Sequence, residues 1–184
     1  GIDLGEIVES RILPSHLRQK DKADKLGILD VRVLLNNKEQ IDIEIQVTSS
    51  EYWAERTLFY LGKMFVDQLK PGEDYQKLEK CIHVGILNFT LFDDQEYYSR
   101  FHFWSDQGRK MYSDKFEIHT LELPKLAKHE YPETELLKWL QFINAESKEE
   151  FEMAAEKSEY IKKAYEDLNR ISADEEKRLE YEAR

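Results

Sequence analysis

The chain is poor in cysteine, in long apolar runs and in positive charge. Its one cysteine, Cys81, cannot form an intramolecular disulfide, so a reducing compartment is expected. No stretch approaches the roughly 18 consecutive apolar residues of a membrane helix, and no signal peptide is recognisable. The net charge of −11 disfavours indiscriminate binding to nucleic acid, which depends on Lys and Arg. These absences predict a soluble, cytoplasmic protein without a membrane partner.

Several catalytic and binding motifs are absent as well. The sequence has no Ser-His-Asp or Cys-His constellation, no glycine-rich phosphate loop and no Cys/His zinc spacing. Three histidines lie inside strand patterns without metal-ligand spacing, and we interpret them as packing residues: His83, His102 and His119. The length of 184 residues and the 41% hydrophobic content fit one domain with an appended segment.

Apolar and alternating patterns predict a sheet followed by helices. The expected strands cover residues 5–11, 26–35, 40–48, 80–88, 98–105 and 115–123. A helix is expected at residues 50–69, with Thr48 and Glu51 as a capping box and an apolar stripe of Trp53, Leu58, Leu61, Phe65 and Leu69. After Pro132 the pattern is helical, with an interruption at Ser158. We therefore expect an α/β core at residues 1–130 and a helical C-terminal extension at residues 131–184.

The stretch IDIEIQVTSS, residues 41–50, alternates apolar and polar side chains. Odd positions are apolar both here and in LGILDVRVLL, residues 26–35, so pairing the two strands buries both apolar rows only if paired residue numbers sum to an even value. A sum near 74 places Asp30 opposite Glu44, with Cβ atoms roughly 4.5 to 5.5 Å apart. Two carboxylates at that separation repel each other unless a positive charge lies between them.

Two explanations remain open for these carboxylates. A divalent cation with oxygen ligands, Mg²⁺ or Mn²⁺, would neutralise them, and the helix start that follows Gln46 suits a phosphate beside it. Alternatively, the acidic row is the solvated face of a hairpin, and Arg32 removes the repulsion by pairing with Glu44 or Asp42.

The ordered series of motifs resembles a known family. It consists of Asp30, then Glu44-Ile45-Gln46, then EYWAERTLFYLGKMFVDQL, KPGEDYQKL and HVGILNFTLF. This series is similar to the PD-(D/E)XK nuclease superfamily, in its transposase-like branch related to recombination-promoting nucleases, over about residues 7 to 125, with a weaker likeness in the tail. The resemblance implies a restriction-endonuclease-like mixed sheet flanked by helices and Mg²⁺-dependent cleavage of DNA phosphodiesters.

The resemblance also implies roles for individual residues. Asp30 and Glu44 would be metal ligands, Ile45 would lend its carbonyl oxygen, and Gln46 would stand where the superfamily usually has Lys. Glutamine cannot take a proton, but it can orient water or a phosphate oxygen. Arg56 and Tyr60 would brace Gln46 or contact phosphate, or else form an ordinary helix-surface pair. Beside these roles, the basic residues themselves suggest further phosphate contacts from Arg32, Lys63 and the loop cations Arg18, Lys20, Lys22 and Lys25. The alternative for this loop, equally open, is a solvated charged turn.

Two functions follow from these residues and from the resemblance. The first is a metal-dependent DNA endonuclease associated with mobile elements, with DNA as its partner. The alternative is a catalytically inert DNA-binding or protein-interaction module that keeps the nuclease fold. The branch usually carries a helix before the first strand, and we expect it upstream of GIDLGEIVES. The C-terminal helices are expected to serve homo-oligomerisation or domain contacts.

Overall fold

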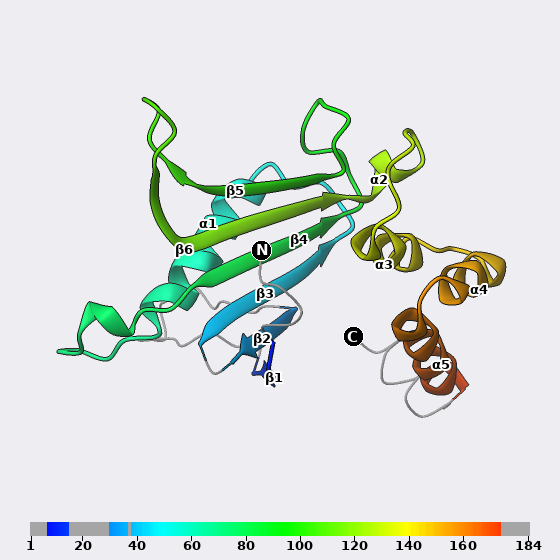
Figure 1. Cartoon of the computed structure of the whole chain (residues 1–184), viewed down its shortest axis with the longest axis horizontal. Helices are drawn as coiled ribbons and strands as arrows, with labels where there is room; N and C mark the ends of the chain where they lie inside the picture. The colour runs from blue at the N-terminus through cyan, green and yellow to red at the C-terminus, as the bar shows by residue number, and fades with distance from the viewer. Residues whose placement is uncertain (1–6, 15–29, 37, 174–184) are drawn as a thin grey trace. The chain divides into compact units, whose positions relative to one another are not determined.

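A six-stranded mixed sheet forms the first part of the protein (Figure 1). The computed structural model describes residues 7–14, 30–36 and 38–173. The strand order is β1-β2-β3-β4-β6-β5, with antiparallel pairs at both edges and parallel pairs β3–β4 and β4–β6 between them. The strands are β1 (Ser10–Leu13), β2 (Val31–Leu35), β3 (Glu39–Gln46), β4 (Cys81–Leu87), β5 (Tyr98–Trp104) and β6 (Met111–Glu122). The fold is the α/β mixed-sheet class expected from the sequence.

Helix α1 (Trp53–Val66) links the parallel neighbours β3 and β4. Parallel strands require such a crossover, because the chain must return to the starting edge of the sheet before the second strand can run in the same direction. The short helix η2 (Tyr75–Lys77) follows α1 and precedes β4. Leu61 and Met64 of α1 are completely buried with Cys81 of β4 in one apolar cluster. The helix therefore covers one face of the central strands.

The helix differs from its predicted form in two respects. It is shorter than residues 50–69, and the predicted capping box is wrong, because Tyr52 occupies the N-cap and makes no side-chain capping bond. The buried positions are Trp53, Thr57, Leu61 and Met64, which recur every three or four residues. Leu58 is rotated by about 100° from Thr57 and is 50% exposed, so its place in the predicted stripe is also wrong.

The register between β2 and β3 is the predicted one. Arg32 pairs with Asp42 and Val31 with Ile43, so residue numbers sum to 74. One further step along this register brings Asp30, which directly precedes β2, opposite Glu44.

The predicted burial of the two strand faces is wrong. Helix α1 covers the face with the polar side chains, where Asp42 is fully buried and Glu44 nearly so. The apolar row is partly open among the described residues, with Val31 41% and Ile45 50% exposed. Alternation therefore located the two faces correctly but not which of them the helix covers.

Several predicted features fall outside the described residues. These are the strand portions at residues 5, 6 and 26–29, the loop cations Arg18, Lys20, Lys22 and Lys25, and the last part of the tail from residue 174. The other strands lie close to their expected ranges, although β6 begins at Met111, earlier than predicted.

The chain divides into two compact units, one ending at Lys125 and the other beginning at Leu126. After α2 (Leu123–Leu126), the second unit contains α3 (Glu135–Ile143), α4 (Lys148–Glu156) and α5 (Glu159–Ala173). Helix α4 begins with a capping box between Ser147 and Glu150. The buried core of the second unit consists of one residue from each of α3, α4 and α5, namely Phe142, Ala154 and Ile161. The predicted interruption at Ser158 is confirmed, because α4 ends and α5 begins on either side of it.

Candidate functional site

The polar row of β3 is joined by Asp30 from the neighbouring chain segment. The Asp30 Oδ2 atom accepts a hydrogen bond of 3.1 Å from the backbone N–H of Ile45. The carboxylate therefore lies beside the last residues of β3, where Glu44-Ile45-Gln46 ends the strand. Asp30 and the end of β3, which the sequence predicted to act together, are thus neighbours on adjacent chain segments.

Arg56 connects Glu44 with Gln46. Its Nη2 atom forms an ion pair with the Glu44 Oε1 atom and donates a hydrogen bond of 2.8 Å to the Gln46 Oε1 atom. The Gln46 Nε2 atom donates to the Thr48 carbonyl oxygen at 2.9 Å, which fixes the amide at both ends. Since Arg56 lies in the first turn of α1, the helix that follows β3 orients the two side chains that end the strand.

A buried Asp–His pair lies next to Glu44 and was missed from sequence. His83 of β4 pairs in register with Asp42 of β3, and its Nδ1 atom lies 2.8 Å from the Asp42 Oδ2 atom. Both side chains are fully buried. The strand patterns alone indicate a packing role for His83 and a solvated row for Asp42. The signal that could have found the pair is the parallel register of β3 and β4, which sequence patterns do not specify.

Trp53 covers this part of the sheet. Its ring centroid lies 5.7 Å from that of His83, and the Arg56 guanidinium carbon lies 5.4 Å from its centroid. Gly85 faces Glu44 in the β3–β4 register, and a Cβ atom on it would stand 2.6 Å from the Trp53 Cζ2 atom. The indole thus takes the space that a side chain at position 85 would need, and its ring face packs against the Arg56 guanidinium.

The residues around Glu44 have the donor set of a divalent-cation site. One ligand atom each of Asp42, Glu44 and His83 lies within 4.8 Å of the other two, so a modest side-chain adjustment would let them share one ion. Two fully buried atoms there, Asp42 Oδ1 and His83 Nε2, have no hydrogen-bond partner among the described residues. Asp30 approaches from the residue before β2, Asp42 lies on β3 beside Glu44, and His83 approaches from β4. The carboxylate oxygens of this set fit Mg²⁺ or Mn²⁺.

Two other expected site residues lie elsewhere. The Arg32 Nη2 atom donates to the Gln40 Oε1 atom at 2.5 Å, and no ion pair between Arg32 and Glu44 occurs in the described part of the chain. Burial lowers the pKa of the Arg32 guanidinium from its ordinary value, against the opposing effect of nearby Asp67. Tyr60 packs against the Leu61–Met64–Cys81 cluster rather than against Gln46. Of the basic residues expected here, Arg56 alone is in contact with Glu44 within the described ranges.

Comparison with known proteins identifies the family of the chain. A model of the family described as PD-(D/E)XK nuclease family transposase matches residues 2–184. No match was found among curated proteins, and none among solved structures. No helix in the described ranges is long and apolar enough to cross a membrane. The match extends over nearly the whole chain, and the protein belongs to the PD-(D/E)XK nuclease family transposases.

Proposed function

We propose that the protein is a metal-dependent DNA endonuclease that hydrolyses phosphodiester bonds at the end of β3. The observation that carries the proposal is the meeting of Asp30, Glu44 and Gln46 at that strand end, with Arg56 bound to the last two. Family membership supports the same chemistry, because nucleases of this superfamily act on DNA. The proposed role lies in the recombination of mobile elements.

Asp30 and Glu44 would hold Mg²⁺ or Mn²⁺ together with the carbonyl oxygen of Ile45. The bound ion supplies Lewis-acid chemistry, since it lowers the pKa of water and neutralises charge that develops on the phosphate. The two carboxylates supply the negative charge for this binding. The buried Asp42–His83 pair lies next to Glu44, with one ligand atom of each of the three residues within 4.8 Å of the others.

Gln46 and Arg56 would position the reactants. Gln46 carries no charge and takes no proton, so its amide N–H orients a water or a phosphate oxygen through hydrogen bonds alone. Arg56 offers several N–H donors in the plane of its guanidinium, which suits it to a phosphate oxygen as well as to Gln46. Its guanidinium is held by Glu44, Gln46 and the Trp53 ring, so it needs little reorganisation to act there.

One observation favours a second candidate function. The ion pair between Arg56 and Glu44 neutralises a carboxylate of the site with a protein cation. A protein without catalytic activity could use the same ion pair to compensate the charge of a nearly buried Glu44 and so keep the fold. The alternative is therefore a catalytically inert DNA-binding or protein-interaction module.

A nicking assay with the full-length protein on supercoiled DNA separates these functions. Cleavage should require Mg²⁺ or Mn²⁺ and stop in EDTA. Asp30→Ala and Glu44→Ala should abolish it, because each removes a direct ligand. Gln46→Ala should slow it less, since only neutral hydrogen bonds are lost, and Gln46→Lys tests whether the usual lysine can serve in this position. Ca²⁺ should bind but support cleavage poorly, because its oxygen shell is looser than that of Mg²⁺.

Mn²⁺ binding, followed by electron paramagnetic resonance, provides a readout that does not depend on turnover. Asp30→Ala and Glu44→Ala should weaken it, whereas Glu51→Ala, which removes an exposed carboxylate near α1, should leave it unchanged. Cleavage that persists in EDTA, or that survives both carboxylate substitutions, would refute the assignment of these residues. Folded variants without any cleavage or metal binding, the wild type included, would leave the inert module as the function.

A further inference from the structure

The exposed charges at the edge of the sheet farthest from β1 are mostly positive. The hairpin formed by β5 and β6, residues 98–122, contains four Lys or Arg residues and four acidic ones, whereas the whole chain has a net charge of −11. Two of the four acidic residues, Glu117 and Glu122, are buried. The exposed part of the hairpin is therefore positive within a strongly acidic protein.

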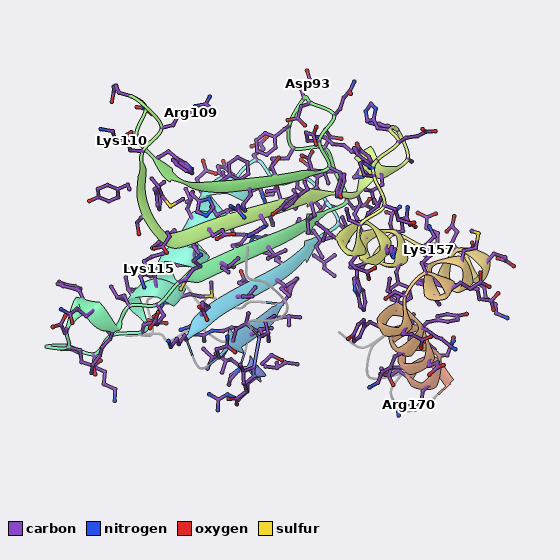
Figure 2. The ribbon with its side chains drawn as sticks, in the orientation of Figure 1. Asp93, Arg109, Lys110, Lys115, Lys157 and Arg170 are labelled. Carbon is purple, nitrogen blue, oxygen red and sulfur yellow. The ribbon has the colours of Figure 1, made fainter. Side chains whose placement is uncertain are left out.

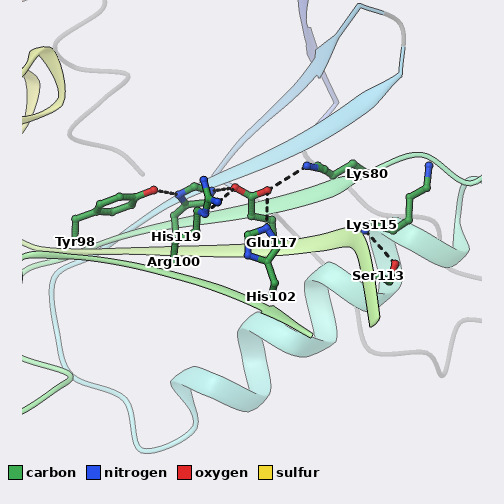
Figure 3. Close-up of polar contacts among 8 residues, drawn as sticks. All are labelled: Lys80, Tyr98, Arg100, His102, Ser113, Lys115, Glu117 and His119. Atoms are coloured by element: carbon green, nitrogen blue, oxygen red, sulfur yellow. Dashed lines mark hydrogen bonds and ion pairs between the residues drawn. The ribbon is translucent and has the colours of Figure 1, made fainter. Parts of the chain in front are cut away.

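Glu117 organises the cations on this face (Figure 3). Its carboxylate oxygens lie 3.2 Å from Lys80 Nζ, 3.2 Å from His102 Nε2, 2.8 Å from His119 Nε2 and 3.8 Å from Arg100 Nε. A single negative charge thus faces two permanent cations and two imidazoles. Tyr98 continues the network, because its hydroxyl lies 2.9 Å from the His119 Nδ1 atom. The Arg100 side chain is 41% exposed, so its charge is available to a partner.

The same face continues into an ordered turn. Trp104 lies 6.2 Å from His102, ring centroid to centroid, and is 50% exposed. Ser105 fixes the turn: its N–H donates to the Lys110 carbonyl oxygen at 2.9 Å, and its hydroxyl accepts from the Lys110 N–H at 3.1 Å. Gly108 and Arg109 adopt positive φ angles of 80° and 48°. A left-handed arginine costs free energy, so the bonds at Ser105 must hold the turn in this form.

The cations of the turn point into solvent. Figure 2 shows Arg109 and Lys110 at the tip of the hairpin. Among the residues that the structure describes, neither side chain has a hydrogen bond or an ion pair. We call the resulting surface the basic face and define it by Lys80, Arg100, Trp104, Arg109 and Lys110.

The chemistry of the basic face matches a nucleic-acid strand. Lys and Arg bind backbone phosphates, and an exposed indole stacks on an unpaired base of any sequence. Arg100 and Trp104 are four residues apart on β5, a rise of about 13 Å, so the cation and the indole can contact the same bound strand at two points. An ordinary protein partner for the exposed Trp104 would not explain the two cations in the turn that follows it, Arg109 and Lys110, which are unpaired among the described residues.

We propose that the basic face binds a single-stranded segment of DNA, with phosphates on its four cations and a base stacked on Trp104. The inference rests on the proposed function, since it assigns the DNA a second contact beyond the site at Glu44. It adds an expectation that the nuclease function alone does not contain, namely a preference for DNA with an unpaired segment. Glu117 is a positioning residue here, because it holds Lys80 and Arg100 in place.

Binding of fluorescent oligonucleotides of about 20 nucleotides, measured by anisotropy in EDTA, tests this inference without cleavage. Trp104→Ala should weaken single-strand binding about tenfold, and Trp104→Phe should restore most of it. The double variant Arg109→Ala/Lys110→Ala should lower the slope of log K against log salt by about 1.4, the value for two contacts on a single strand. Duplex binding should respond to the cation variant but little to Trp104→Ala.

A matched control is the double variant Lys162→Ala/Lys163→Ala, which removes two adjacent exposed cations from α5. It should bind as the wild type does. Equal binding by wild type, Trp104→Ala and the Arg109/Lys110 variant would overturn the inference, even if cleavage proves metal-dependent. Conversely, weakened single-strand binding in these variants would support the basic face even if Asp30 and Glu44 proved irrelevant to cleavage. Circular dichroism of each variant establishes that lost binding is not lost folding.

Discussion

Replacing Gly85 with alanine should destabilise the sheet and disturb the site through a single clash. The new Cβ atom would stand 2.6 Å from Trp53 Cζ2 and 3.3 Å from Cη2, whereas ordinary contacts begin at 3.4 Å. The indole must therefore move by nearly 1 Å, and it is only 3% exposed, so it has little free space to move into. Overpacking of this kind costs about 1 to 3 kcal/mol. Since Trp53 supports Arg56, the displacement should also weaken the hold on Glu44 and Gln46.

Urea unfolding followed by tryptophan fluorescence measures this cost. The midpoint should fall while the slope m stays constant, because the extent of exposed surface does not change. Gly62→Ala is the control: it adds a methyl group within α1, where nothing lies within 4 Å, and it should be neutral or stabilise by about 0.5 to 1 kcal/mol. In a Trp53→Phe background, Gly85→Ala should cost less, by more than about 0.5 kcal/mol, because the smaller ring leaves room. Wild-type stability of Gly85→Ala, or no coupling to Trp53, would contradict this packing of the indole against the glycine.

Other predictions concern the core, the Glu117 cluster and the helical unit. Leu61→Ala should lower the free energy of unfolding by about 2 to 5 kcal/mol, since Leu61 is completely buried, and a negligible change in urea unfolding would mean that α1 does not pack as described. Burial raises the pKa of Glu117, but its bonds to Lys80 and His119 outweigh that effect and lower the pKa to about 2. A depressed carboxylate pKa stabilises the fold above the ordinary value near 4.5, so stability should be lost as pH falls from there toward 2. Glu117→Gln should lose much of this dependence in acid titrations followed by circular dichroism, and an unchanged profile would be evidence against the cluster. Deleting the extension, residues 131–184, should alter oligomeric state in sedimentation and leave metal-dependent nicking in place, whereas loss of nicking with an unchanged oligomeric state would contradict this assignment.

The register and the element types could be predicted because they depend on local patterns. Odd apolar positions in residues 29–35 and 41–47 require an even sum, and the pairs observed sum to 74. The covered face of β3 could not be predicted, because alternation distinguishes two faces without saying which one a helix will meet. Burial of the polar face depends on Arg56 and His83, which supply partners for Glu44 and Asp42. A buried polar group is tolerated when it is bonded, so these distant partners, not the local pattern, decide the outcome.

The candidate site was predictable in part for the same reason. Asp30, Glu44 and Gln46 lie on one predicted hairpin and its exit, and the sequence is sufficient to bring them together. His83 is 41 residues from Asp42, and their contact requires the parallel pairing of β3 with β4. The sequence also could not distinguish the roles of Arg56 and Tyr60, which the structure places in different surroundings. Arg56 lies toward the end of β3, while Tyr60, one turn later, packs into the core.

The β3–α1–β4 crossover has a consequence for the order in which the chain can fold. The pairing of β2 with β3 joins residues that are close in sequence and can form early. The parallel pairing of β3 with β4 must wait for loop closure across α1. Until β4 arrives, Asp42 lacks His83, and β3 exposes an acidic row that disfavours burial. During synthesis the ribosome must therefore release at least the residues through Leu87 before β3 can be enclosed. An exposed row of acidic side chains disfavours pairing of β3 with the wrong strand in the meantime.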